Sequence, residues 1–185
     1  SQILIVNPGP DFLLAWSQKA MKYGCKCCVA VPNIYVASAY RMEFKNLQFC
    51  IFSDIANYAK RFDLIAIVSP FTAEEFSIGT MLSAGNDQAN FVALLPQTFI
   101  SASENNICAL LRDQGFLPSK IIAIAPNATV TQPRKKMLLF AGRSVDSNVP
   151  IPVFFTQFDQ SASNLIVEKE YIQATQQHQK KPTTL

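Results

Sequence analysis

The sequence predicts a single α/β domain in which helices cover both faces of a mostly parallel sheet. Apolar runs of strand length alternate with segments of helical periodicity as far as Gly115. Hydrophobic residues make up 49% of the 185 residues and charged residues 16%, which suits a sheet buried on both faces. Beyond Gly115 two strand-like runs follow each other with no helical pattern between them, which predicts a closing antiparallel hairpin.

The expected strands are short, apolar and rich in β-branched residues. The first ends at once in Asn7-Pro8-Gly9-Pro10, which is a strong turn signal. In chain order the expected strands are residues 2–6, 25–31, 47–52, 62–68, 89–95, 120–125 and 136–141. Residues 153–158 and 164–167 are expected to add short extended pieces.

Helical spacing marks the segments between the first six strands. In the first segment apolar residues recur three and four positions apart until Gly24 ends the helix. Asn33 follows Pro32 and opens the second helix, Ser53-Asp54 caps a third, and Gly115 ends the last. The expected helices are residues 11–23, 33–44, 54–60, 71–83 and 104–114. Strands joined in this way by helices predict right-handed crossovers.

Residues 1–170 are expected to form the domain, and residues 171–185 a polar, flexible tail rich in Gln, Lys and Thr. The longest apolar stretches are far shorter than the ~18 residues of a membrane span, and no signal-peptide pattern opens the sequence. We therefore expect a cytoplasmic protein without a membrane partner.

The five cysteines do not form a pattern typical of a disulfide framework or a zinc site. Their number is odd, and three of them cluster at positions 25, 27 and 28. The single histidine, His178, lies in the polar tail. We expect buried, reduced strand cysteines and no metal site.

A specific resemblance begins at residues 61–71, RFDLIAIVSPF, where a strand starting Phe-Asp runs into Ser-Pro-Phe. The order continues with FVALLP at residues 91–96, a helix carrying Leu110-Leu111-Arg112, and the closing run KMLLF at residues 136–140. Together these segments resemble adenine-specific (amino) DNA methyltransferases of the restriction-modification type. The resemblance covers about residues 2–142. It implies the class I, Rossmann-like, S-adenosylmethionine-dependent methyltransferase fold. In that fold we expect a seven-stranded sheet, with the first strand central and residues 136–141 inserted antiparallel.

The resemblance also implies a cofactor site for S-adenosylmethionine, and this site is incomplete. Family members carry an acidic residue, a proline and a Gly-x-Gly turn after the first strand, where Asn7, Pro8 and Gly9 keep one glycine in a shorter turn. The ribose-binding acid after the second strand is replaced by Asn33. Asp54 matches the aspartate that contacts the cofactor's adenine, although a plain helix cap explains it equally well. We expect cofactor binding to be weak or lost.

The acceptor motif of the family, Asn-Pro-Pro-Tyr or Asn-Pro-Pro-Phe, is degraded. Its asparagine, which accepts hydrogen bonds from the flipped adenine amine, aligns with Val68, and its prolines align with Ser69 and Pro70. Valine has no acceptor, and Ser69 would aim its oxygen elsewhere. Phe71 holds the place of the stacking aromatic, but its ring is also well suited to the core. The resemblance therefore implies an inactive transfer site.

The mild net charge of +3 does not by itself indicate nucleic-acid binding, and basic runs such as those at 133–136 and 180–181 are more often solvated surface than phosphate-binding sites. The residues after Gly142 are too few and too polar for a target-recognition region. The sequence therefore predicts a degenerate DNA adenine methyltransferase-like domain that acts as a binding or assembly element. The expected partner is a protein, through which DNA would be reached. Two alternatives stay open: an active methyltransferase with divergent motifs, and a Rossmann-like protein interaction module.

Overall fold

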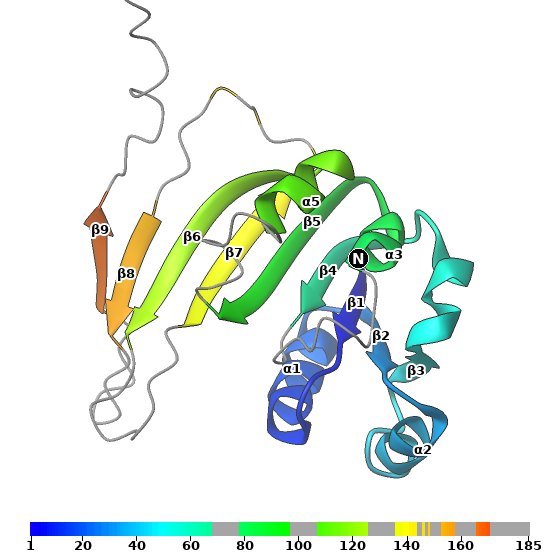
Figure 1. Ribbon diagram of the computed structural model, residues 1–185. Coiled ribbons are helices and arrows are strands. Elements are labelled where there is room, and N and C mark those ends of the chain that lie inside the picture. Colours follow the sequence, from blue (N-terminus) through cyan, green and yellow to red (C-terminus); the bar gives the residue numbers. More distant parts are fainter. Residues whose placement is uncertain are drawn as a thin grey trace, which may run out of the picture.

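A single twisted sheet organises the molecule (Figure 1). The computed structural model describes residues 1–67, 78–96, 107–125, 136–143, 146, 148, 153–157 and 166–170. Within these ranges nine strands form one sheet in the order β3-β2-β1-β4-β5-β7-β6-β8-β9. The strands are β1 (Gln2–Val6), β2 (Lys26–Val31), β3 (Gln48–Ile51), β4 (Phe62–Ile67), β5 (Gly85–Pro96), β6 (Leu117–Ala125), β7 (Lys136–Gly142), β8 (Val153–Gln157) and β9 (Ile166–Glu170). The helices in the described ranges are α1 (Pro10–Lys22), α2 (Ile34–Glu43), the 3-10 helix η1 (Phe52–Tyr58), α3 (Ile78–Ser83) and α5 (Ile107–Asp113).

The predicted class of fold is confirmed. Strands β1 to β5 run parallel, and β1 lies between β2 and β4 at the centre of that group. Strand β7 is inserted antiparallel between β5 and β6, as the sequence predicts. Two further strands extend the sheet past β6, where β8 pairs parallel with β6 and β9 pairs antiparallel with β8. The predicted hairpin is therefore present, but it is not the edge of the sheet.

Local boundaries differ from the prediction in two places. The expected cap at Ser53-Asp54 is wrong, because the 3-10 helix already begins at Phe52 and its N-cap, Ile51, makes no side-chain cap hydrogen bond. Strand β5 begins at Gly85 rather than at residue 89. A Cβ at position 85 would lie 2.8 Å from the Ala89 Cβ, so this close approach needs glycine. The expected helices 71–83 and 104–114 are described only from Ile78 and Ile107 onward.

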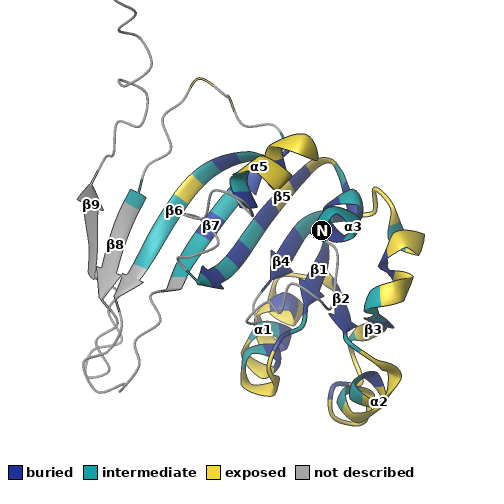
Figure 2. Ribbon diagram, viewed as in Figure 1, coloured by how far each residue is buried: buried dark blue, intermediate teal, exposed yellow. Residues whose placement is uncertain are grey.

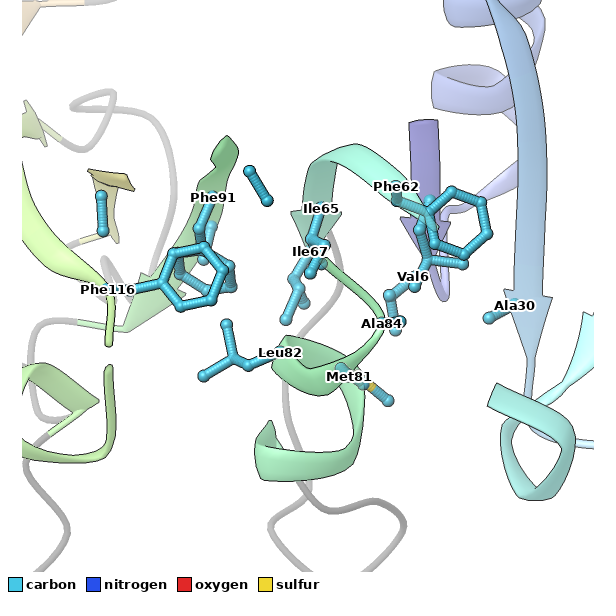
Figure 3. Close-up of a cluster of buried hydrophobic side chains, with 14 of the residues drawn as sticks. Val6, Ala30, Phe62, Ile65, Ile67, Met81, Leu82, Ala84, Phe91 and Phe116 are labelled. Carbon is cyan, nitrogen blue, oxygen red and sulfur yellow. The ribbon is translucent and has the colours of Figure 1, made fainter. Parts of the chain in front are cut away.

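The core is divided between the two faces of the sheet because neighbouring residues in a strand point to opposite faces. On β2, Val29 and Val31 pack with Leu13 of α1 and with α2, whereas Cys28 and Ala30 face the opposite cluster. This second cluster contains η1, α3 and α5 and is the larger one. Figure 3 shows its centre, where side chains of β4, β5 and α3 meet around Phe91. The sheet is therefore buried on both faces along its parallel strands.

Helix α1 shows how the sequence specifies a helix that packs by one face. Pro10 occupies the first turn, where its missing N–H costs no hydrogen bond, and the C-cap Tyr23 donates its N–H to the Lys19 carbonyl. Leu13, Ser17 and Ala20 are buried on one face, and the outer face is exposed (Figure 2). No helix in the described part is long and apolar enough to cross a membrane.

None of the five cysteines forms a disulfide. Cys27, Cys28 and Cys50 are buried in β2 and β3, as predicted. Cys25 precedes β2 and Cys108 lies in α5, and both are only half-buried, so the prediction is wrong for these two. The Cys28 and Cys50 sulfurs lie 3.7 Å apart in a buried hydrogen bond between β2 and β3. That contact, together with burial, raises the pKa of the Cys50 thiol above its ordinary range. In the described ranges, no group of three or more His, Cys, Asp or Glu side chains is arranged so that it could hold a metal ion.

Candidate cofactor and acceptor site

The residues that the resemblance assigns to the cofactor follow the first three parallel strands. Asn7 comes directly after β1, Asn33 comes soon after β2, and Asp54 lies in the first turn of η1 after β3. Because parallel strands end at the same edge of a sheet, the fold places all three at the edge where α/β proteins bind ligands. The structure thus brings the predicted cofactor residues to one end of the sheet.

The turn between β1 and α1 is short, and its polar groups are bound within the protein. It consists of Asn7, Pro8 and Gly9, since β1 ends at Val6 and α1 begins at Pro10. Asn7 adopts a left-handed conformation with φ of 48°, and its amide donates to the Ala30 carbonyl at 2.8 Å. The Pro8 carbonyl accepts a hydrogen bond from the Tyr40 hydroxyl of α2 at 3.2 Å. The turn is therefore closed by contacts from β2 and α2.

Few donors remain at the amino end of α1. Pro10 has no N–H, and the Leu13 amide already donates to the Gly9 carbonyl at 3.0 Å. The amides of Asp11 and Phe12 are the remaining first-turn donors. Asp11 adds a negative charge there, which opposes binding of a carboxylate. Gly9 is the feature that still suits a ligand, because nothing lies within 4 Å of the Cβ position and its φ of −69° does not require glycine.

Asn33, at the place of the ribose-binding acid, is used by the helix that follows it. Its side-chain oxygen accepts from the backbone amides of Tyr35 and Val36, both at 3.1 Å, so it is the N-cap of α2. The predicted helix start is thereby confirmed. An oxygen that already accepts two amide hydrogen bonds is poorly placed to accept two ribose hydroxyls as well. This end of β2 offers no carboxylate.

Asp54 is an acidic residue at the carboxyl end of β3, in the first turn of η1. It is exposed, and its carboxylate makes no hydrogen bond or ion pair within the described residues. It does not cap η1, so the helix-cap explanation of this residue is wrong. Its carboxylate stays free to accept a hydrogen bond.

The candidate acceptor residues Val68, Ser69, Pro70 and Phe71 lie outside the described residues. Strand β4 ends at Ile67, between β1 and β5. The motif therefore begins directly after a central strand.

The comparisons with known proteins establish the fold of the chain but not its activity. No protein-family model matches the chain, and no curated protein matches it in sequence. Among solved structures, it is similar to a predicted O-methyltransferase from Agrobacterium tumefaciens, with a TM-score of 0.59 and 13% identity over 84% of this chain and 78% of that one. A 16S rRNA (adenine(1408)-N(1))-methyltransferase from Catenulisporales acidiphilia, solved with its cosubstrate S-adenosylmethionine, gives a TM-score of 0.54 at 10% identity, covering 80% of this chain and 88% of that one.

A third similar structure is a spermidine synthase from Thermotoga maritima, with a TM-score of 0.55 and 15% identity over 80% of this chain. The chain spans about half of that protein, 54% of its length. The first seven strands lie in the order 3-2-1-4-5-7-6 with β7 antiparallel, and this topology identifies the fold. This is the class I S-adenosylmethionine-dependent methyltransferase fold. At these identities the similarity establishes the architecture of the chain, and the methyltransferase fold alone does not specify a substrate.

Two features of the methyltransferase fold in this chain were missed at the sequence level. The Tyr40 bond to Pro8 joins residues 32 positions apart, and no local pattern predicts it. The second feature is a pair of hollows at the amino ends of the strands. A signal for it was present, because Lys26 opens β2, Lys45 shortly precedes β3, and Arg61 directly precedes β4.

Proposed function

We propose that the chain is a degenerate methyltransferase-fold domain, of the DNA adenine type that its sequence resembles, which has lost methyl transfer and acts as a binding or assembly element. The observation that carries the proposal is the bonding of Asn33. Its oxygen accepts the amides of Tyr35 and Val36 at 3.1 Å, at the place where the family uses a carboxylate.

The loss of that carboxylate has a measurable cost. A hydrogen bond to a charged group is typically worth about 1.5–3 kcal/mol, which corresponds to about a tenfold to hundredfold change in affinity. Asn33 has a second group, its amide nitrogen, but a donor does not replace an acceptor of two hydroxyl protons. This domain therefore lacks the charged contact to the ribose of the cofactor.

The β1–α1 turn supports the same proposal. The methionine end of the cofactor carries a carboxylate and an amine, which need backbone partners close to the turn. Here the Asn7 amide and the Pro8 carbonyl are already bound within the protein, and Asp11 repels a carboxylate at the start of α1. The described residues therefore do not fit the methionine end of the cofactor.

The acceptor side of the proposal rests on the sequence. Val68 stands where the family has the asparagine that binds the amine, and a flipped adenine would lose hydrogen bonds worth about 1–3 kcal/mol each. Duplex DNA would be reached through a protein that binds this domain.

A second candidate function is an active methyltransferase with divergent motifs. Two observations favour it, the unpartnered carboxylate of Asp54 and the open space in front of Gly9. A third reading, a protein interaction module, is favoured by the position of the hollows in the described part of the chain. Both lie at the amino ends of the strands.

A methyl-transfer assay tests the proposal. The purified chain is incubated with tritium-labelled S-adenosylmethionine and unmethylated DNA, and incorporation is compared with that of a heat-inactivated sample. We expect equal counts. The Val68→Asn variant should also stay at background, because the cofactor contacts stay absent. Incorporation by the wild-type chain above background would overturn the proposal in favour of the active enzyme.

A further inference from the structure

The amino ends of the parallel strands carry the strongest unexplained feature of the described surface. The N label in Figure 1 marks this end, opposite the cofactor edge. Lys26 begins β2, Lys45 lies shortly before β3, and Arg61 lies directly before β4. Since parallel strands start at one edge of a sheet, these three cations lie along that edge. Arg41, in the last turn of α2, joins them.

Two hollows of about 390 and 450 Å³ lie beside these cations and share part of their lining. Lys26 and Arg61 line the first hollow, Arg41 and Lys45 line the second, and Leu47 and Gln48 line both. Gln2, Asn46 and Gln48 add side-chain amides, which can both donate and accept hydrogen bonds. No Asp or Glu side chain of the described residues lines either hollow.

The carboxylates nearest to this end have other partners or lie outside the hollows. Both oxygens of Asp63 accept hydrogen bonds at 2.7 Å, from the Gln2 amide and from the Asn86 side chain. Asp87 forms an exposed ion pair with Lys60 at 3.2 Å. Glu43 is exposed at the end of α2. Positive charge therefore dominates the lining.

The cations are presented toward solvent. Lys26 and Lys45 are exposed and form no ion pair within the described residues. The Arg61 guanidinium lies 5.3 Å from the centre of the Tyr58 ring and donates from Nε to Gln2 at 3.0 Å, which leaves its two terminal nitrogens available. One terminal nitrogen of Arg41 donates to the Phe49 carbonyl at 3.0 Å, so that side chain is also held in place.

An exposed aromatic residue lies close in the chain to residues that line the first hollow. Tyr23, at the end of α1, is 73% exposed, and it lies in the chain between Met21 and Cys25, which both line the hollow. Lys22 lies 5.9 Å from the centre of its ring. A large aromatic that buries little of its surface contributes little to folding, but its free face suits stacking.

We propose that the amino ends of β1 to β4 form a binding surface for single-stranded nucleic acid. Lys26, Lys45, Arg41 and Arg61 contact consecutive phosphates along the two hollows, and Tyr23 stacks on a base. A basic groove with an exposed aromatic and side-chain amides is the combination by which proteins hold single strands. A duplex keeps its bases paired and stacked, so it would offer the Tyr23 ring no free base. This surface lies away from the cofactor edge, so the inference does not depend on the proposed function.

Fluorescence anisotropy with labelled oligo(dT) and oligo(U) of about 16 nucleotides tests the inference. The full chain is titrated over a salt series from about 50 to about 200 mM. Four phosphate contacts predict a log–log salt slope of about −3, since each contributes about −0.7 for a single strand. The two probes separate DNA from RNA as the ligand, and either one supports the inference.

Matched variants separate the site from net charge. Lys26→Gln with Arg61→Gln should weaken binding about tenfold and halve the salt slope. The control, Lys120→Gln with Arg112→Gln, removes the same charge from exposed positions on β6 and α5 and should change affinity by less than about twofold. Circular dichroism verifies that each variant is folded.

Stacking is tested at Tyr23 against Tyr35, which is 83% exposed at the start of α2, near the opposite end of the sheet. Tyr23→Ala should weaken binding about fivefold or more, Tyr23→Phe should retain it, and Tyr35→Ala should leave it unchanged. Equal losses in the site and control variants, or competition by polyglutamate as strong as by oligo(dT), would show unspecific charge attraction and overturn the inference. Absence of binding at the lowest salt would overturn it too.

Discussion

The two ends of the parallel strands use their polar groups in opposite ways. At the carboxyl ends, Asn33 accepts two backbone amides and the Pro8 carbonyl accepts the Tyr40 hydroxyl. At the amino ends, Lys26 and Lys45 stay exposed beside two hollows. The methyltransferase fold offers ligands the first of these ends. In this chain, intramolecular bonds occupy much of that end, and the opposite end keeps its polar side chains available.

This difference shows how a fold can be retained while its ligand-binding residues are lost. An N-cap needs an acceptor oxygen, and Asn supplies it as well as Asp does. Replacing a ribose-binding carboxylate by Asn33 therefore costs α2 little, while it removes the charge that a ligand needs. Likewise, the hydrogen bond from the Tyr40 hydroxyl stabilises the turn and occupies the Pro8 carbonyl oxygen, which is then less available to a ligand.

The larger core cluster packs on the central strands that connect the two ends, so a large cavity there should destabilise the whole sheet. Phe91 is 1% exposed and packs at 6.4 Å between ring centroids with Phe116 (Figure 3). Phe91→Ala should lower the free energy of unfolding by about 3–5 kcal/mol in urea denaturation. Leu110→Ala, at a position 42% exposed, is the control and should stay within about 0.5 kcal/mol. A loss below about 1 kcal/mol for Phe91→Ala would contradict this packing.

Asp63 joins three strands at the amino ends through its bonds to Gln2 and Asn86. Asp63→Ala should cost about 1–2 kcal/mol in the free energy of unfolding. Asp87→Ala, which breaks an exposed ion pair, should cost less than about 0.5 kcal/mol. Equal effects of both substitutions would show that the Asp63 bonds add nothing.

The Asp63 contribution should depend on pH. The hydrogen bond from the Gln2 amide, with that from Asn86, lowers the pKa of the Asp63 carboxyl below its ordinary value. A lowered pKa in the folded state means that the stabilisation is present above the unfolded pKa of about 4 and is lost as the pH falls through the folded pKa. The difference in melting temperature between wild type and Asp63→Ala should therefore shrink below about pH 4. A constant difference would refute the assignment.

At the carboxyl ends, Asn33 is tested as a cap. Asn33→Ala leaves the amides of Tyr35 and Val36 without their acceptor and should cost about 1 kcal/mol by thermal denaturation. Asn33→Asp keeps an acceptor and should stay within about 0.5 kcal/mol of the wild type. If both variants are equally destabilised, the side chain has another role than capping.

The smallest effect is expected at Tyr40. Tyr40→Phe removes only the hydroxyl that donates to Pro8 and should cost about 0.5 kcal/mol, the low end for a half-buried hydrogen bond. The matched control is Tyr35→Phe, whose ring is 83% exposed. Titration of the phenol sharpens the comparison, because burial raises the pKa of Tyr40, with a smaller contribution from Glu43. An ordinary pKa for Tyr40 would contradict its placement.

The sequence predicted the fold well because its signals are local. Short apolar runs, separated by segments with helical spacing, located β1 to β5, and two further runs located β6 and β7. Asn33 marked the start of α2. The cap at Ser53-Asp54 was wrong, because a short 3-10 turn can begin on any residue that leaves a strand, here Phe52. The Tyr40–Pro8 bond and the two hollows come from residues brought together by the topology, which one sequence does not reveal. The roles of Val68 to Phe71 stay predictions.

The central claim, that the carboxyl ends no longer bind the cofactor well, is tested most directly by calorimetric titration of the full chain with S-adenosylmethionine and S-adenosylhomocysteine. The missing carboxylate and the closed β1–α1 turn predict a Kd weaker than ~100 μM for both. Asn33→Asp restores a charged acceptor and should tighten binding by about tenfold at most, because the β1–α1 turn stays closed. Micromolar binding that Asp54→Ala abolishes would contradict the account and identify a functional cofactor pocket.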